Sequence, residues 1–361
     1  MAAQNHPEVT RVLVTGASGF IATHTVQQLQ QAGYKVRGTV RSLKNANKVK
    51  HLKDLCPNAA HELELVEADL LNEQCWASVV QGCSHVLHLA SPFPVASPTD
   101  ENELIKPAVQ GTTSVLQACA DAGTVKRVVL TSSVYAISDA AAPKPRAHTE
   151  EDWPDVSTLT PYPKSKALAE KSAWEFMKSL PDDKKFELAV VNPGYVMGPV
   201  LSGSYCSSIT LVKRILTSDP PANLRINFGV VDVRDVARGH IKAMTEPEAA
   251  GRRHILVNKS MWMSDVAEIL KAEFQQHGYN VSTSNLPKLI FKAVAIFDKD
   301  AKEMAPTWNK AVDFDTTRMR QVLKIEPIPI QDTFVDMGYN VIEGGHVKKH
   351  KNYKGRPTAK S

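Results

Sequence analysis

The stretch Arg11-Val-Leu-Val-Thr-Gly-Ala-Ser-Gly-Phe-Ile-Ala22 joins a short apolar run to a glycine-rich turn and the start of a helical pattern. Residues 11–15 are expected to form a strand that ends at Gly16, and residues 21–32 a helix that ends at Gly33. Gly16 permits a sharp turn, Gly19 lets the backbone approach a pyrophosphate, and the helix start presents N–H groups and a positive dipole end. This order predicts a dinucleotide-binding domain at the start of the chain.

Short apolar runs alternate with longer helical patterns through the first half of the sequence. Further strands are expected at residues 35–40, 63–68, 85–90, 127–132 and 188–192, and helices at residues 105–122 and 164–180. Strands separated by helices of this length imply right-handed crossovers and a parallel sheet that is covered on both faces. The predicted fold class is therefore α/β, a doubly wound parallel sheet of the Rossmann type.

The alternation ends after Pro193, where Pro- and Gly-rich turns mark loops, and helical periods return only at residues 231–244 and 263–276. We therefore expect a smaller, discontinuous substrate-binding domain. The predicted division assigns residues 1–192 and 226–250 to the Rossmann domain, 193–225 and 251–346 to the C-terminal substrate domain, and 347–361 to a basic flexible tail.

The charge of the chain is concentrated in that tail. Residues 347–361 carry six Lys and Arg side chains and no acid, so the net charge of +5 becomes −1 for the rest of the chain. A basic tail could contact a polyanion or a membrane surface, but the simpler interpretation is a solvated, mobile terminus. Nothing else in the sequence indicates nucleic-acid binding.

The composition is that of a folded globular protein, with 43% hydrophobic and 22% charged residues in a chain of 361. It excludes a disordered regulator, a collagen-like fibre and a coiled-coil rod. No apolar run is long enough to span a bilayer, and residues 1–12 hold no apolar stretch of signal-peptide length. Five scattered cysteines without a C-x-x-C pair favour reduced thiols and a cytoplasmic location.

The end of the second expected strand predicts which dinucleotide is bound. NAD-binding domains place an acid about 20 residues after the glycines, where it holds the ribose 2′-hydroxyl. Here the strand ends at Arg41, and Lys44 and Lys48 follow. An arginine pairs with a 2′-phosphate that a carboxylate would repel, so NADPH is favoured. Asp69-Leu70, after the third strand, is placed to meet the adenine, although Asp69 could equally be a helix cap.

The residues expected to carry chemistry are Tyr162 and Lys166, which follow Ser132-Ser133 by about 30 residues. The spacing of four puts Tyr162 and Lys166 on one helical face. A free tyrosine, with a pKa of about 10, is a poor acid–base catalyst at neutral pH. A nearby ammonium group and an oxidised nicotinamide would bring the pKa of the phenol toward the working range, and a serine at a strand end could hydrogen-bond the substrate oxygen.

These motifs resemble those of extended short-chain dehydrogenases/reductases, in particular the dihydroflavonol-reductase-like branch with its plant dihydroflavonol and cinnamoyl-CoA reductases and fungal aldehyde, ketone and methylglyoxal reductases. The resemblance covers roughly residues 9–340. It rests on residues 14–21, 33–41, 48–52, 81–83, 103–107, 130–133, 162–170 and 193–199.

The resemblance implies a role for each matching residue. Tyr162 would be the proton donor, Lys166 its electrostatic partner and the holder of the nicotinamide ribose, and Ser133, rather than Ser132, the substrate-polarising serine. The matching cofactor-binding residues would be Gly16, Ser18, Gly19, Phe20, Ile21, Arg41, Lys48, Asp69, Leu70, Ala90, Ser91, Pro193, Tyr195, Val196 and Ser208, together with Tyr162 and Lys166. No metal site is expected, and family members occur as monomers and homodimers.

The leading prediction is an NADPH-dependent reductase of aldehydes or ketones. Plant dihydroflavonol reductases carry an asparagine five residues after the catalytic serine, and Ser138 at that position argues against a dihydroflavonol substrate. A hydroxysteroid dehydrogenase, a sugar-nucleotide epimerase and a non-catalytic NADPH-sensing protein remain alternatives. The candidate residues for an apolar substrate pocket are Phe93, Val95, Tyr135, Tyr195, Met197 and Tyr205.

Overall fold

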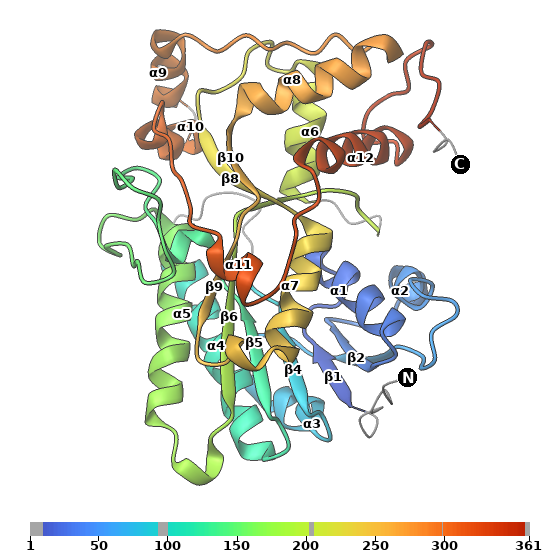
Figure 1. The fold of residues 1–361 in the computed structure, drawn as a ribbon, viewed down its shortest axis with the longest axis vertical. Helices are drawn as coiled ribbons and strands as arrows, with labels where there is room; N and C mark the ends of the chain where they lie inside the picture. The colour runs from blue at the N-terminus through green and yellow to red at the C-terminus, as the bar shows by residue number, and fades with distance from the viewer. Residues whose placement is uncertain (1–9, 93–99, 202–205, 298, 358–361) are drawn as a thin grey trace.

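A seven-stranded parallel sheet forms the centre of the computed structural model (Figure 1), which describes residues 10–92, 100–201, 206–297 and 299–357. The strand order β3-β2-β1-β4-β5-β6-β9 confirms the predicted doubly wound α/β fold. The strands are β1 (Arg11–Val14), β2 (Lys35–Val40), β3 (Glu64–Glu67), β4 (His85–His88), β5 (Arg127–Thr131), β6 (Glu187–Pro193) and β9 (Arg253–Leu256).

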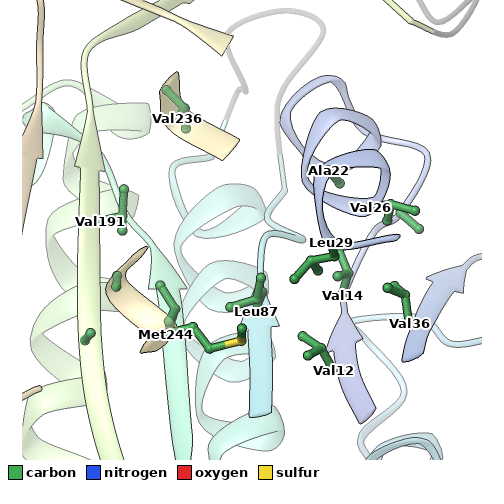
Figure 2. Close-up of a cluster of buried hydrophobic side chains, with 14 of the residues drawn as sticks. Val12, Val14, Ala22, Val26, Leu29, Val36, Leu87, Val191, Val236 and Met244 are labelled. Carbon is green, nitrogen blue, oxygen red and sulfur yellow. The ribbon is translucent and has the colours of Figure 1, made fainter. Parts of the chain in front are cut away.

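Helices cover both faces of this sheet because side chains of the central strands alternate between two apolar cores. Val12 and Val14 face the core under α1 (Phe20–Gln31), α2 (Ala46–Lys53), α7 (Val233–Thr245) and α11 (Thr317–Gln321). Leu13 faces the core under α3 (Trp76–Val80), α4 (Asn102–Ala122) and α5 (Pro161–Ser179). Figure 2 shows the first of these cores, where strand residues such as Leu87 and Val191 lie opposite Leu29 of α1 and Met244 of α7.

A smaller unit lies beyond the carboxyl ends of the large sheet, at the top of Figure 1. Its three strands have the order β10-β8-β7 and are β7 (Tyr195–Met197), β8 (Asn227–Asp232) and β10 (Lys259–Trp262). They pack against α6 (Ser207–Thr217), α8 (Met263–Phe274) and α12 (Ile330–Glu343), and α9 (Lys288–Phe297) and α10 (Lys299–Met304) complete the unit. None of the helices in the described ranges combines the length and apolar character that crossing a bilayer requires.

The chain passes between the two units at Gly194, directly after β6. A Cβ atom built there would lie 2.4 Å from the carbonyl oxygen of Gly229 in β8, so only glycine allows the two backbones to approach this closely. This is the first place where the chain crosses from the large sheet to the small one, since β6 ends at Pro193 and β7 begins at Tyr195.

The predicted division between the units differs from the structure at two strands. The segment 226–250, expected in the Rossmann domain, supplies β8 to the small sheet. The segment 251–346, expected in the substrate domain, supplies β9, which pairs with β6 as the seventh strand of the large sheet. Neither strand is among those that the sequence predicts, and segments of four to six residues do not identify the sheet that they join.

The basic C-terminal segment also differs from its prediction, because residues 347–357 pack against the small unit instead of forming a flexible tail. Val347 is buried in the core of that unit, and Tyr353 packs at its edge. The hydroxyl of Tyr279 donates a hydrogen bond to the Lys348 carbonyl (3.1 Å), and Arg356 pairs with Asp336. Two apolar side chains among the lysines thus anchor the segment, which a charge count alone does not reveal.

Candidate active site

The predicted site residues gather along one edge of the large sheet, where the strands end. The glycine turn follows β1, Arg41 follows β2, Ser91 follows β4, and Ser133 follows β5. Tyr162 lies in the first turn of α5, and β6 ends at Pro193. This is the edge at which open α/β sheets bind their ligands, and the small unit lies across it (Figure 1).

The turn after β1 has the backbone geometry that a phosphate site requires. Gly16 has a φ of 65°, and a Cβ atom built on it would lie 3.1 Å from the Cβ of Ala90. Its N–H donates to the hydroxyl of Thr39 (2.9 Å), which fixes the turn against β2. Helix α1 begins at Phe20, with no side-chain cap on Gly19 and no acid in its first turn. The half-buried Ser18, Phe20 and Ile21 complete this turn, which fits a dinucleotide pyrophosphate.

A buried histidine joins this turn to the loop after β4. His88 Nδ1 lies 2.8 Å from the hydroxyl oxygen of Thr15, and that oxygen accepts a hydrogen bond from the N–H of Ala90 (2.9 Å). Burial, together with the nearby ammonium group of Lys166, lowers the pKa of His88 to about 3. His88 is therefore neutral at working pH and holds the loop in place, a role that its position in a strand did not indicate.

The side chain expected to select the cofactor lies at the rim of this edge. Arg41 directly follows β2, is exposed, and makes no ion pair with the described residues. Its loop is fixed because the N–H of Leu43 donates to the carboxylate of Glu67 (2.6 Å). The guanidinium group is thus accessible to an anionic ligand. Lys48 lies in α2, and its side chain is outside the described residues.

The predicted adenine contacts lie in the turn after β3. Asp69 is exposed, and its Oδ1 accepts a hydrogen bond from the N–H of Leu71 (3.0 Å), so this carboxylate stabilises its own turn. Leu70 packs against Gly111 of α4, where a Cβ atom would lie 3.1 Å from its side chain. Asn72, and not Asp69, caps the short helix η1 (Glu73–Cys75) that follows, so the structure gives Asp69 a turn contact in place of the helix cap that the sequence left open.

The two serines after β5 differ in accessibility. Ser132 is buried, and its hydroxyl makes no hydrogen bond within the described structure. Ser133 is half-buried and begins the short helix η2 (Val134–Ala136), and its Oγ accepts a hydrogen bond from the N–H of Tyr135 (3.2 Å). Of the two hydroxyls, Ser133 is the one that a ligand can reach.

Tyr162 and Lys166 lie one turn apart on α5, as their spacing predicts. The helix begins at Pro161, whose fixed φ suits the first helical position. The Lys166 ammonium lies 5.8 Å from the centre of the Tyr162 ring and donates a hydrogen bond to the hydroxyl of Ser91 (2.9 Å). Helix α5 and the loop after β4, which are distant in sequence, therefore meet at Lys166.

Burial shifts the pKa of both groups. It raises the pKa of the Tyr162 phenol well above its usual value, and the neighbouring Tyr135 and Tyr195 add to this effect. Burial also lowers the pKa of Lys166 to about 8. At neutral pH the phenol carries its proton and the amine is mostly charged. This is the combination that protonation of a substrate oxygen requires.

Aromatic side chains form the surroundings of Tyr162. Tyr135 is 36% exposed and meets Tyr162 edge to face, with ring centres 6.0 Å apart. Tyr195 of β7 packs against Phe228 of β8 at 5.3 Å. Met197, another expected pocket residue, is fully buried in the core of the small unit. Phe93, Val95 and Tyr205 lie outside the described residues.

The remaining predicted contacts lie where the chain enters the small unit. Pro193 ends β6, and Val196 is the central residue of β7. The Ser208 hydroxyl in the first turn of α6 donates to the Val196 carbonyl (2.6 Å). Ser208 therefore fixes α6 against β7, so this predicted cofactor contact already has a structural partner.

Comparison with known proteins gives consistent results. The sequence matches the NAD dependent epimerase/dehydratase family over residues 12–257. Cinnamoyl-CoA reductase CAD2 of Medicago truncatula is 39% identical over 266 residues, 72% of this chain and 79% of the relative. Dihydroflavonol 4-reductase of Zea mays is 34% identical over 274 residues, 74% and 75% of the two chains. The structure of yeast methylglyoxal/isovaleraldehyde reductase Gre2 complexed with NADPH has a TM-score of 0.75 and 29% identity, and the match covers 92% of this chain and 98% of that one.

Proposed function

Because this chain belongs to the NAD dependent epimerase/dehydratase family, as an NAD(P)-dependent reductase of the extended short-chain type, we propose that it reduces an aldehyde or ketone with NADPH. The observation that carries the proposal is that Lys166 lies 5.8 Å from the centre of the Tyr162 ring, while Tyr135, in the short helix η2 that begins at Ser133, packs against that ring at 6.0 Å. None of Ser133, Tyr162 and Lys166 is missing, which disfavours a non-catalytic sensor.

Each of the three side chains has a distinct task in this proposal. Ser133 donates a hydrogen bond to the carbonyl oxygen and orients it. Tyr162 gives its phenolic proton to that oxygen as negative charge develops there. Lys166, held by Ser91, places a positive charge near the phenol and stabilises the phenolate that remains. The raised pKa of Tyr162 keeps the proton in place until the reaction needs it.

The residues around the glycine turn fit NADPH. When bound, the cofactor supplies the hydride that reaches the carbonyl carbon. The turn at Gly16 and the uncapped start of α1 would hold the pyrophosphate, and Arg41 would pair with the 2′-phosphate. A structural relative is a complex with NADPH, which supports this choice over NADH.

The aromatic surroundings of Tyr162 support a neutral carbonyl substrate with apolar groups. Tyr135 and Tyr195 present ring surfaces and no charge. Ser138, which replaces the asparagine of plant dihydroflavonol reductases, is buried and donates its hydroxyl to the Val134 carbonyl (3.4 Å). It is therefore not placed to meet the hydroxyl groups of a flavonoid, so dihydroflavonols are disfavoured.

The test is NADPH oxidation at 340 nm with a panel of carbonyls: methylglyoxal, aliphatic and aromatic aldehydes, a diketone, a dihydroflavonol and a 3-ketosteroid. We expect turnover of aldehydes or simple ketones with NADPH well ahead of NADH. Tyr162→Phe should lose turnover and keep NADPH binding, whereas Tyr34→Phe, which alters a half-buried tyrosine just after the C-terminal end of α1, should behave like wild type. Unchanged turnover in Tyr162→Phe would refute the assignment.

A further inference from the structure

One buried asparagine connects the serine loop, which is Ser133 with the short helix η2, to the helix α5 that carries Tyr162. Asn192, next to last in β6, is fully buried. Its side-chain amide donates one hydrogen bond to the main-chain carbonyl of Ser133 (3.1 Å) and another to the carboxylate of Glu170 (2.8 Å). Both donor hydrogens of the amide are thereby used.

Glu170 is placed to transmit this contact along α5. It follows Lys166 by four residues and Tyr162 by eight, so all three side chains lie on one face of the helix. Glu170 is fully buried, and Arg253 of β9 meets its carboxylate through Nε (2.5 Å). The indole N–H of Trp174 donates to the same carboxylate (3.2 Å).

Arg253 fixes the serine loop from the other side. Its guanidinium group donates to the carbonyl of Ala136, the last residue of η2 (2.6 Å), and stacks on the ring of Trp153 at 3.8 Å. The turn that begins at Ser133 is therefore held at its first residue by Asn192 and at its last by Arg253. Both of these side chains converge on Glu170 of α5.

We propose that Asn192 is a positioning residue that sets the location of the Ser133 hydroxyl relative to that of Tyr162. Its two amide hydrogen bonds run to the Ser133 backbone and to the Glu170 carboxylate, and it acts through these two contacts. The inference rests on the proposed function, in which both hydroxyls must reach one carbonyl oxygen. A misplacement of about 1 Å between reacting groups costs on the order of 100-fold in rate, so a rigid link between the two segments has a large effect.

The test is a double-mutant cycle between Asn192→Ala and Ser133→Ala, with NADPH affinity measured for every variant. We expect Asn192→Ala to lower kcat by about 10- to 100-fold with NADPH affinity unchanged. In the Ser133→Ala background the same substitution should lower kcat by less than about threefold, because the hydroxyl that Asn192 positions is no longer there. Equal, multiplicative losses in both backgrounds would mean a merely structural role and would overturn the proposal.

A matched control and a milder variant keep the result interpretable. Asn223 is also buried and donates through its amide to two carbonyls, those of Ser282 and Ser284, in the small unit. Asn223→Ala should lower stability, and any loss of kcat should be the same in the wild-type and in the Ser133→Ala background. If Asn192→Ala does not fold, Asn192→Ser, which keeps one donor, replaces it in the cycle.

The outcome separates this inference from the proposed function. If the wild type reduces carbonyls and the cycle is multiplicative, the function stands and the positioning role fails. If the wild type reduces no carbonyl, the proposed function fails. Crystal structures of the wild type and of Asn192→Ala then test the positioning role. Asn192→Ala must then show Ser133 displaced relative to Tyr162 by more than about 0.5 Å, the tolerance of a preorganised site, and an unmoved pair would overturn it.

Discussion

The ammonium group of Lys166 donates a hydrogen bond to the hydroxyl of Ser91 at 2.9 Å, although 75 residues separate the two in sequence. Ser91 belongs to the loop after β4, and the Thr15–His88 hydrogen bond fixes that loop to the glycine turn. The contact therefore couples the helix that carries the proposed proton donor to the proposed cofactor site. It also determines where the positive charge near Tyr162 is held.

The pH dependence of reduction should report on Lys166. Its pKa is lowered to about 8, so the ammonium is present below that pH and is lost as the pH rises through it. Tyr162 keeps its proton across this range because its pKa is raised, and His88 stays neutral. We expect kcat/KM for the carbonyl to fall up to tenfold per pH unit above about 8. Lys166→Arg should be slower but lack this decrease up to pH 10, and an unchanged alkaline decrease would contradict the assignment.

Removal of the Ser91 hydroxyl should move this decrease to lower pH. Without its acceptor the buried ammonium is less stabilised, so the pKa of Lys166 falls further. A hydrogen bond to a charged group contributes about 1.5–3 kcal/mol, and we expect Ser91→Ala to shift the midpoint of the decrease by about one pH unit or more. Ser91→Thr keeps a hydroxyl and is the control. Identical pH–rate profiles for wild type and Ser91→Ala would show that the contact does not affect Lys166.

The cofactor preference should depend on Arg41. Loss of a charge-assisted hydrogen bond to the 2′-phosphate corresponds to a roughly 10- to 100-fold weaker binding of NADPH. Arg41→Ala should show this change in a fluorescence titration, while NADH binding stays the same. Arg320→Ala, which removes an exposed arginine that pairs with Glu326, should leave both affinities unchanged. Equal weakening of NADPH and NADH by Arg41→Ala would contradict recognition of the 2′-phosphate.

The packing of the C-terminal segment should be measurable as stability. Val347 is buried, and Val347→Ala removes two methyl equivalents from the core of the small unit. We expect the free energy of unfolding to fall by about 1.5 kcal/mol in urea denaturation. Lys351→Ala, at an exposed lysine four residues later, should change it by less than about 0.5 kcal/mol. Equal stabilities for the two variants would mean that the segment is detached in solution.

The sequence predicted the first six strands of the large sheet and the shared helical face of Tyr162 and Lys166, because both depend on local pattern. Each strand of the first half is an apolar run bounded by a turn, and the spacing of Tyr162 and Lys166 is itself a helical contact. Because the strands are parallel, their carboxyl ends lie at one edge of the sheet, which brings Gly16 after β1 and Ser133 after β5 to the same edge.

What the sequence could not predict are contacts between distant segments. Nothing local distinguishes Asn192 or Glu170 from an ordinary buried polar residue, and their link appears only when β6 lies beside α5. The sequence predicts no helix after residue 276, yet that region contains α9, in which Leu289 is 82% and Phe297 91% exposed. Apolar composition indicates a helix or strand, but it does not say whether the surrounding chain covers it.

The measurement that tests the central claim most directly follows deuterium from NADPH into the product. The carbonyl with the fastest turnover is reduced with NADPH labelled at one or the other face of C4, and the alcohol is analysed by mass spectrometry. The account predicts one deuterium on the carbinol carbon from only one of the two labels, and no labelled alcohol with Tyr162→Phe. Alcohol without deuterium from either label would contradict hydride transfer from NADPH. Labelled alcohol formed by Tyr162→Phe at the wild-type rate would contradict protonation of the carbonyl by Tyr162.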